Sequence, residues 1–253
     1  MITDLQKASV LKRASAWLLD FILLITLATG CMALISYVTN FDHYDDLYRE
    51  RYDFYEKEYN TKFEPTQEEF DAYTEEELER REEAMEALFA DEQAAYAYNM
   101  MMSLTLLIAT LGILAAFLIL EFAVPLWLKN GQTVGKKAFG IAVMLTGGYR
   151  INTVCLFVRS ILGKFTVETM IPVLVMIMLM LSVTGIFGTF LVVGIGIAQL
   201  IAIVITRTNS AIHDLMADTV VVDLATQMIF ESPEDRLEYE KRLAAEQAAE
   251  QTY

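Results

Sequence analysis

The stretch TMIPVLVMIMLMLSVTGIFGTFLVVGIGIAQLIAIVIT, residues 169–206, decides the fold class of this chain. It runs for 38 residues without an acidic or basic side chain. A single helix needs roughly 20 apolar residues to cross a bilayer, so this stretch is too long for one span. Thr184–Gly188, near its middle, has a glycine at 185 and another at 188 and favours a turn. We therefore predict a helical hairpin over 167–184 and 188–206, with one tilted helix plus a buried continuation as the alternative.

Outside this hairpin, two more apolar segments are long enough to cross a membrane. Ala14–Val38 is interrupted by Asp20, and Met100–Leu128 is interrupted by Glu121. Both segments exceed the length that a span requires. The sequence therefore predicts an all-α membrane protein with four transmembrane helices.

Charge is distributed unevenly along the chain, whose net charge is -15 although its mean hydropathy is +0.38. Residues 41–99 hold 20 acids and 6 bases, residues 224–253 hold 7 and 3, and the remainder holds 7 and 10. A slightly basic membrane body thus carries two acidic appendages. We divide the chain into an N-terminus with the first span (1–40), an acidic hairpin (41–99), a membrane body (100–223) and an acidic tail (224–253).

The basic residues near the predicted spans predict the orientation of the chain in the membrane. They are Lys7, Lys12 and Arg13 before the first span, Lys129, Lys136, Lys137, Arg150, Arg159 and Lys164 between the second and third, and Arg207 after the fourth. Lysine and arginine are enriched in cytoplasmic loops. With four spans, all these residues fall on one side. We therefore expect both termini in the cytoplasm and residues 41–99 on the extracytoplasmic side.

The acidic segment 41–99 has the periodicity of helices. Tyrosines recur at steps of four and three, which places them on one helical face: Tyr44, Tyr48, Tyr52, Tyr55 and Tyr59. Residues 60–66 break the pattern, and 66–69 and 74–77 both fit the capping box that begins a helix. We predict an extracytoplasmic antiparallel helical hairpin that extends the first two spans. Its tyrosines are expected to pack across the hairpin, and a ligand-stacking surface is the alternative.

Three short segments on the opposite side predict a small cytoplasmic β-element. Phe139–Leu145 is short and partly β-branched, Thr146–Gly148 is a turn signal, and Tyr149–Val154 can return as a second strand. Thr219–Val222 is a third strand candidate, preceded by a short helix within 209–217.

Three charged side chains near the cytoplasmic ends of the first two spans form a candidate ion or proton site: Arg13, Asp20 and Glu121. Arg13 and Asp20 share a face of one helix but lie about 10 Å apart along its axis, so each is expected to meet a partner on another element. Carboxylates inside a membrane are costly without a partner. They form either a cation or proton site, or an internal clasp that locks the helices. Compensating bases beside both acids, for which Lys129 and Arg159 are available, would favour the clasp.

The glycine-rich segment 130–140 directly follows the second span. It lacks the Walker spacing, because only three residues separate Gly131 from Gly135, so nucleotide binding is not expected. Its default interpretation is a structural turn in which Gln132 and Thr133 cap backbone groups. Binding of anionic lipid headgroups is the alternative, through Lys136, Lys137 and Arg150.

Other catalytic or metal-binding patterns are missing from the sequence. Cys31 and Cys155 lie in segments of different character, and His213 and His43 are expected on opposite faces of the membrane. We therefore expect no disulfide, no metal, no cofactor, no nucleic-acid partner and no enzymatic activity. His213 is expected to be a surface or hydrogen-bonding residue.

Three blocks of the sequence, in order, resemble the RDD family of bacterial membrane proteins: Arg13–Asp20, Gly131–Lys137 and His213–Val222. The family is named for an arginine and two aspartates, which here correspond to Arg13, Asp20 and Asp214. The central block carries the motif residues Gly131, Gln132, Thr133, Gly135 and Lys136, and the closing block carries His213 and Asp214. Ala142, where the family often has an arginine, and the long insertion 41–99 depart from the pattern.

The resemblance implies a multi-pass protein of the bacterial cytoplasmic (inner) membrane, and two functions stay open. The first is an ion-coupled carrier for cation/proton exchange, with Asp20 and Glu121 as exchanging carboxylates and Arg13 setting their charge. Four spans are few for a carrier, so this reading includes a homodimer. The second is a non-transporting scaffold or assembly factor that docks an extracytoplasmic protein partner through 41–99.

Overall fold

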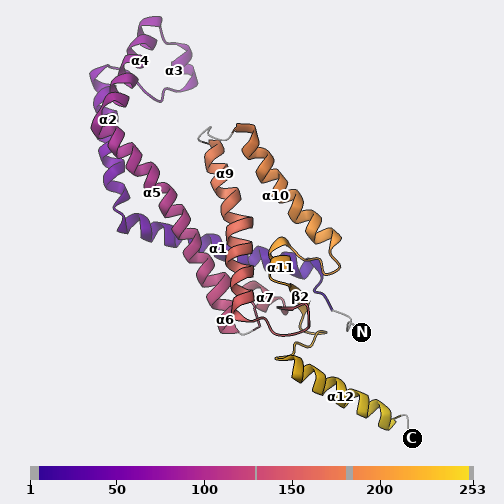
Figure 1. Cartoon of the computed structure of the whole chain (residues 1–253). Helices are drawn as coiled ribbons and strands as arrows, with labels where there is room; N and C mark the ends of the chain where they lie inside the picture. The colour runs from indigo at the N-terminus through magenta and orange to yellow at the C-terminus, as the bar shows by residue number, and fades with distance from the viewer. Residues whose placement is uncertain (1–5, 129, 181–184, 251–253) are drawn as a thin grey trace. The chain divides into compact units, whose positions relative to one another are not determined.

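The computed structural model describes residues 6–128, 130–180 and 185–250, and Figure 1 shows the course of the chain. The chain forms two compact units, one from residues 1–28 with 114–253 and the other from residues 29–113. The described residues are mostly helical and include one two-stranded sheet. The boundaries between the units fall inside α1 (Val10–Val38) and α5 (Glu92–Phe117).

Four helical segments are long and apolar enough to cross a membrane, as predicted. They are α1, then α5 with η1 (Leu118–Ala123) and α6 (Val124–Leu128), then α8 (Thr153–Phe157) with η2 (Val158–Met170) and α9 (Ile171–Met180), and last α10 (Gly185–Ile205). Many of their apolar side chains are exposed, Phe187 and Val204 to about four-fifths. A bilayer would cover such side chains. The predicted membrane hairpin corresponds to α9 and α10, which run beside each other (Figure 1).

The third membrane helix begins much earlier than predicted. The sequence placed its start near residue 167, but the helical segment begins at Thr153, where the Asn152 side chain accepts a hydrogen bond from Cys155 N at 2.7 Å. Arg159 and Lys164, counted above as loop bases, therefore lie inside this helix. The fourth begins at Gly185 rather than at 188. Most of the predicted turn between them, residues 181–184, lies outside the described residues.

The small β-element exists and has two strands. β1 (Ile141–Leu145) pairs antiparallel with β2 (Thr219–Asp223), in a register that places Val143 opposite Val221. The predicted turn is present, since Gly148 has a φ of 88° and Gly148 N donates to Leu145 O. The predicted strand Tyr149–Val154 was wrong. Arg150 makes one isolated bridge with Met144, and the Asn152 cap then begins α8.

Both faces of this sheet are covered. One face packs into the core of the first unit, which contains Ala8, Ala16, Ile141, Val143, Ile151, Leu156 and Val221. The other face contributes Met144, Val220 and Val222, which pack with Ile229. Ala8 N donates to Val221 O at 3.1 Å, so the segment before α1 runs along the edge of β2. The start of the first membrane helix is thereby fixed to the sheet.

Short helices flank the two strands. α7 (Val134–Ala138) precedes β1, and α11 (Ile212–Met216) precedes β2 within the predicted helical segment 209–217. The tail forms α12 (Pro233–Glu250), whose Arg236 donates to Gly147 O at 2.8 Å. The strands therefore adjoin α7 and α11, and the turn after β1 contacts the tail.

The second unit contains the predicted helical hairpin. α2 (Phe41–Glu58) packs against α4 (Glu75–Ala90), and α3 (Gln67–Asp71) lies between them in the chain (Figure 1). Both capping boxes are present: Thr66 pairs with Glu69, and Thr74 with Glu77. The hairpin helices are separate from the membrane helices. Asn40, with a φ of 53°, divides α1 from α2, and Asp91 divides α4 from α5.

The tyrosine stripe packs inside this hairpin, as predicted. Its core comprises Phe63, Ala84, Leu88 and Ala94, against which Tyr48, Tyr52, Tyr55, Tyr59 and Met85 pack. The Tyr44 ring meets that of Tyr96 with centroids 6.1 Å apart. Burial raises the pKa of Tyr52 to about 12, so this tyrosine is neutral at physiological pH.

Candidate functional site

Asp20 of α1 is buried and is bound by the segment that begins α7. Its carboxylate accepts a hydrogen bond from Gly135 N at 2.7 Å and one from the Thr133 hydroxyl. Lys136 Nζ lies 4.0 Å from Asp20 Oδ2. As predicted, the aspartate meets its partners on another element, and these belong to the glycine-rich segment.

The close contact of α7 with α1 depends on Gly135. A Cβ atom at this position would lie 2.2 Å from Ala16 O and 2.8 Å from Asp20 Cγ. Any side chain there would push the two helices apart and break the hydrogen bond from Gly135 N to Asp20. The glycine is therefore part of the Asp20 site.

Gln132 and Thr133 have the capping roles that the sequence predicted. Gln132 Nε2 donates to Ile141 O at 2.9 Å, and the Thr133 side chain accepts from Lys136 N at the start of α7. Gly131 has a φ of 59°, and a Cβ atom there would lie 2.9 Å from Ile151 Cγ2 and 3.1 Å from Val143 Cβ. This turn presents Thr133, Gly135 and Lys136 to Asp20.

Lys136 is buried, so it is not available to lipid headgroups in this structure, contrary to the sequence-based alternative. Its Nζ donates to Thr133 Oγ1 at 3.2 Å. Burial lowers the pKa of Lys136 to about 8, although the Glu121 carboxylate opposes the shift. Lys137, in contrast, is exposed, and Arg150 pairs with Glu231 at 3.1 Å.

Glu121 is buried in the second membrane helix and pairs with Lys164 of the third. Of the two bases considered from the sequence, Arg159 pairs elsewhere and Lys129 lies outside the described residues. Ser160 of η2 also reaches η1, since its hydroxyl donates to Glu121 O at 2.6 Å. The contact between the second and third helices thus has an ion pair and a hydrogen bond.

The polar residues of this contact lie on π-helical turns. Such turns are rare and occur often at functional sites. In η2 the wider turn is supported by hydroxyls that bond carbonyls five residues earlier: Thr166 to Ile161 O and Thr169 to Lys164 O, each at 2.9 Å.

Asp214 of α11 is fully buried between two arginines. Its Oδ2 lies 3.2 Å from Arg13 Nη2, and its Oδ1 lies 2.7 Å from Arg159 Nη2. Ala211 N also donates to Oδ2 at 3.1 Å. Burial alone would raise the pKa of Asp214, but the charges of Arg159 and Arg13 outweigh it and hold the pKa well below its usual range.

His213, beside Asp214, is largely buried and not a surface residue, although it does form hydrogen bonds as predicted. Its Nδ1 lies 2.9 and 2.8 Å from the two carboxylate oxygens of Glu168, and its Nε2 lies 3.2 Å from Arg159 Nη2. Gly163 permits this packing, because a Cβ there would lie 2.7 Å from His213 Cβ.

The predicted trio of Arg13, Asp20 and Glu121 is therefore divided among three ion pairs. Arg13 joins Asp214, Asp20 joins Lys136, and Glu121 joins Lys164. Sequence reasoning missed the role of Lys164, since residues 153–166 were read as a strand end and a loop, and it assigned no partner to Glu168 at the start of the predicted third span. Reading 153–179 as one helix, with charges at 159, 164 and 168, would have indicated buried partners.

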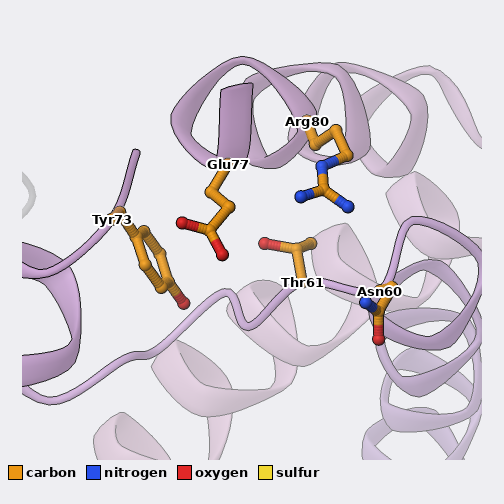
Figure 2. Close-up of a pocket in the computed structure, with 5 residues that line it drawn as sticks. All are labelled: Asn60, Thr61, Tyr73, Glu77 and Arg80. Atoms are coloured by element: carbon orange, nitrogen blue, oxygen red, sulfur yellow. The ribbon is translucent and has the colours of Figure 1, made fainter. Parts of the chain in front are cut away.

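The described residues were also compared with the pattern of a metal site and of a pocket. They contain no group of three or more His, Cys, Asp or Glu side chains arranged to hold a metal ion. Figure 2 shows a pocket in the second unit, lined by Asn60, Thr61, Tyr73, Glu77 and Arg80. Its volume of about 30 Å³ is room for one or two water molecules. None of the predicted site residues lines it.

A comparison with protein families matches residues 7–218 to the RDD family. The match covers most of the chain and includes Arg13, Asp20 and Asp214. The chain therefore belongs to the RDD family, and with its four long apolar helices it is a membrane protein of that family. Comparisons with curated proteins and with solved structures each found no match.

Proposed function

We propose that this protein exchanges a monovalent cation for a proton across the membrane, with Asp20 and Lys136 as the exchanging pair. The observation that carries the proposal is their buried contact, in which Lys136 Nζ lies 4.0 Å from Asp20 Oδ2. The ammonium group of Lys136 occupies the position beside the Asp20 carboxylate that a bound cation would take. Ionisable groups inside membrane proteins commonly mark ion pathways and proton relays.

The exchange follows from charge balance at this pair. With a pKa of about 8, Lys136 gives up its proton near neutral pH at a small free-energy cost. Loss of the proton leaves the Asp20 charge uncompensated, and a monovalent cation then neutralises it, with carboxylate and Thr133 oxygens as ligands. When the cation leaves, Lys136 takes up a proton again. Each cycle moves one cation against one proton.

In this proposal the roles of Glu121 and Arg13 differ from those that the sequence implied. Glu121 pairs with Lys164, and its charge favours the protonated form of Lys136 without exchanging a ligand itself. Arg13 pairs with Asp214 and fixes the start of α1. The distribution of lysine and arginine supports both termini in the cytoplasm, membership of the RDD family supports a bacterial cytoplasmic membrane location, and four spans favour a homodimer.

Proton flux in proteoliposomes tests the proposal. Purified protein is reconstituted with an internal pH-sensitive dye, and sodium, potassium or lithium is added outside. The wild type is expected to move protons in response to at least one cation. Asp20→Asn and Lys136→Gln are each expected to lower the rate at least tenfold, because neither can complete the exchange.

Lys137→Gln is the matched control for this experiment. Lys137 is the exposed neighbour of Lys136 in the same short helix, so its replacement removes the same charge without touching Asp20. Its flux is expected to equal that of the wild type. Absence of cation-dependent flux in folded wild-type protein, or equal loss in the Lys136 and Lys137 variants, would exclude this exchange.

A second candidate function is a scaffold or assembly factor, and one observation favours it. Asp20, Glu121 and Asp214, the buried acids among the described residues of the membrane body, each have a basic partner, as expected of an internal clasp. In this proposal the acidic hairpin lies outside the membrane and docks a protein partner. Replacing residues 43–97 by a short bridge discriminates, since a carrier keeps its flux whereas a scaffold loses its partner.

A further inference from the structure

We infer that His213 is a proton-binding site of the membrane body, distinct from the Asp20–Lys136 pair, and that its protonation breaks the contact between Arg159 and His213. The inference stands on the arrangement of partners around the imidazole ring. Each ring nitrogen faces a group of defined hydrogen-bonding character, which fixes where a proton is held and where one can be added.

The partners select one tautomer of neutral His213. Arg159 Nη2, which can only donate, lies 3.2 Å from Nε2, so this nitrogen accepts and carries no proton. The Glu168 carboxylate lies 2.9 and 2.8 Å from Nδ1 and accepts its N–H. Glu168 also accepts from His213 N at 2.9 Å, which holds ring and backbone in place together.

The charged groups around the ring balance when His213 is neutral. η2 contributes Glu168 and Arg159, α11 contributes Asp214, and α1 contributes Arg13 at the far oxygen of Asp214. These are two acids and two bases. Lys164 of η2 pairs with Glu121. Toward α11, α10 offers the uncharged Gln199, and β2 offers Thr219.

A proton added at Nε2 changes this arrangement. The new N–H points at the Arg159 guanidinium, where donor meets donor and charge meets like charge. Asp214 Oδ1, 3.5 Å from Nε2, is the available acceptor, but it already accepts two hydrogen bonds from Arg159. Protonated His213 must therefore displace Arg159 from part of Asp214.

This displacement reaches the exchanging pair through Arg159, a consequence that rests on the proposed function. Arg159 is one of the charges that lower the pKa of Lys136. When Arg159 shifts, the charge acting on Lys136 changes. Protonation of His213 is therefore expected to alter the rate of exchange.

Nitrogen NMR on the full chain tests the site without any transport assay. The chain has two histidines, His43 and His213, so His43→Gln leaves one imidazole to observe. The ¹⁵N-histidine-labelled protein is placed in lipid nanodiscs and titrated from pH 9 to pH 5. We expect the Nδ1–H tautomer at high pH and an imidazolium at low pH.

Two variants sharpen this measurement. Glu168→Gln removes the carboxylate that favours the imidazolium and is expected to move the titration midpoint to lower pH by about one unit. Arg159→Gln removes the fixed charge at Nε2 and is expected to move it to higher pH. Since Arg159→Gln also leaves Asp214 with one arginine, the Glu168 variant is the primary test.

A spectrum that shows the Nε2–H tautomer at high pH would overturn the proposal. So would an imidazolium that persists throughout the titration, or a ring that never takes up a proton. These outcomes concern His213 alone. Failure of cation/proton exchange leaves them unchanged, and flux that persists with a non-titrating His213 rejects the proton site and not the exchange.

Discussion

Two buried aspartates of the membrane body have opposite environments. Asp214 is held by two arginines and a backbone N–H. Asp20 is held by a backbone N–H, a hydroxyl and one lysine, whose Nζ lies at 4.0 Å. Arginine does not lose its proton in proteins, whereas a buried lysine does so readily. The positive charges beside Asp214 are therefore always present, whereas the positive charge beside Asp20 can be lost.

The difference assigns separate roles to residues that share a family motif. Asp214 connects α1, η2 and α11, so it stabilises the fold near the ends of the first and third membrane helices. Asp20 connects α1 to α7 through neutral donors, and its only basic partner in the described structure is at the limit of a salt bridge. Four variants or conditions test this comparison.

Loss of the Asp214 charge is expected to have the largest effect. In Asp214→Asn the buried Arg159 and the half-buried Arg13 lose their acid, which costs about 3–5 kcal/mol of unfolding free energy. Thermal or denaturant unfolding in detergent measures this change. Asp218→Asn, at an exposed position four residues away, is the matched control and is expected to differ little from wild type. Equal stability of the two variants would contradict the clasp.

The sequence predicted local features well, because short-range rules govern them. Thr66 and Thr74 each precede an acid by three residues, and both capping boxes form. The tyrosine period predicted one packed face, and the uncharged stretch 169–206 contains the predicted membrane hairpin. The strand pair was recognised at both positions, although Asn152 caps a helix where a third strand was expected.

The partners of the buried charges could not be predicted in the same way. Arg159 and Lys164 count as loop bases under the positive-inside rule, yet both lie in a helix with their charges neutralised. Asp20 and Lys136 are 116 positions apart, and their contact depends on the absence of a Cβ at Gly135. Such pairings arise from tertiary packing, which periodicity and spacing do not encode.

The second largest effect is expected in the pH dependence of stability, which differs between the Asp20 region and the Asp214 region. Folding lowers the pKa of Lys136 from 10.5 to about 8, so between these values the folded state binds fewer protons than the unfolded state. Stability therefore rises with pH across this window, by an amount on the order of 2 kcal/mol. The difference in unfolding midpoint between wild type and Lys136→Gln, followed from pH 7 to pH 10.5, measures it.

The lowered pKa of Asp214 affects stability at acidic pH. The contribution of Asp214 to folding stability is complete above the ordinary pKa of aspartate and declines only as pH falls toward the lower pKa of the folded state. It is therefore constant over the window in which Lys136 titrates. A difference curve that is flat between pH 8 and pH 10.5 would reject a titrating Lys136.

Gly135→Ala is expected to act on the Asp20 region alone. The added Cβ clashes with Ala16 O, and overpacking of this kind costs about 1–3 kcal/mol. It also lengthens the Gly135 N–Asp20 contact, so flux should fall together with stability. Gly194→Ala is the control, because a Cβ at Gly194 meets nothing within 4 Å. If Gly135→Ala keeps wild-type flux and stability, the close approach of α7 to α1 is not needed.

The smallest effect is expected in the acidic hairpin, where Thr74 caps α4 and holds the Glu77 carboxylate. Glu77 has a lowered pKa because it accepts from Thr74 N and from the Thr74 hydroxyl. Thr74→Ala removes the cap of α4 and costs about 1 kcal/mol. Amide hydrogen exchange in the first turn of α4 should accelerate about fivefold.

Thr105→Ala is the control. It removes a hydroxyl that bonds Met101 O within a helix and caps nothing, so exchange in α4 should stay unchanged. A similar acceleration in both variants would mean that the cap contributes nothing. Glu77 is partly exposed and is held by Thr74, whereas the buried Asp214 is held by two arginines.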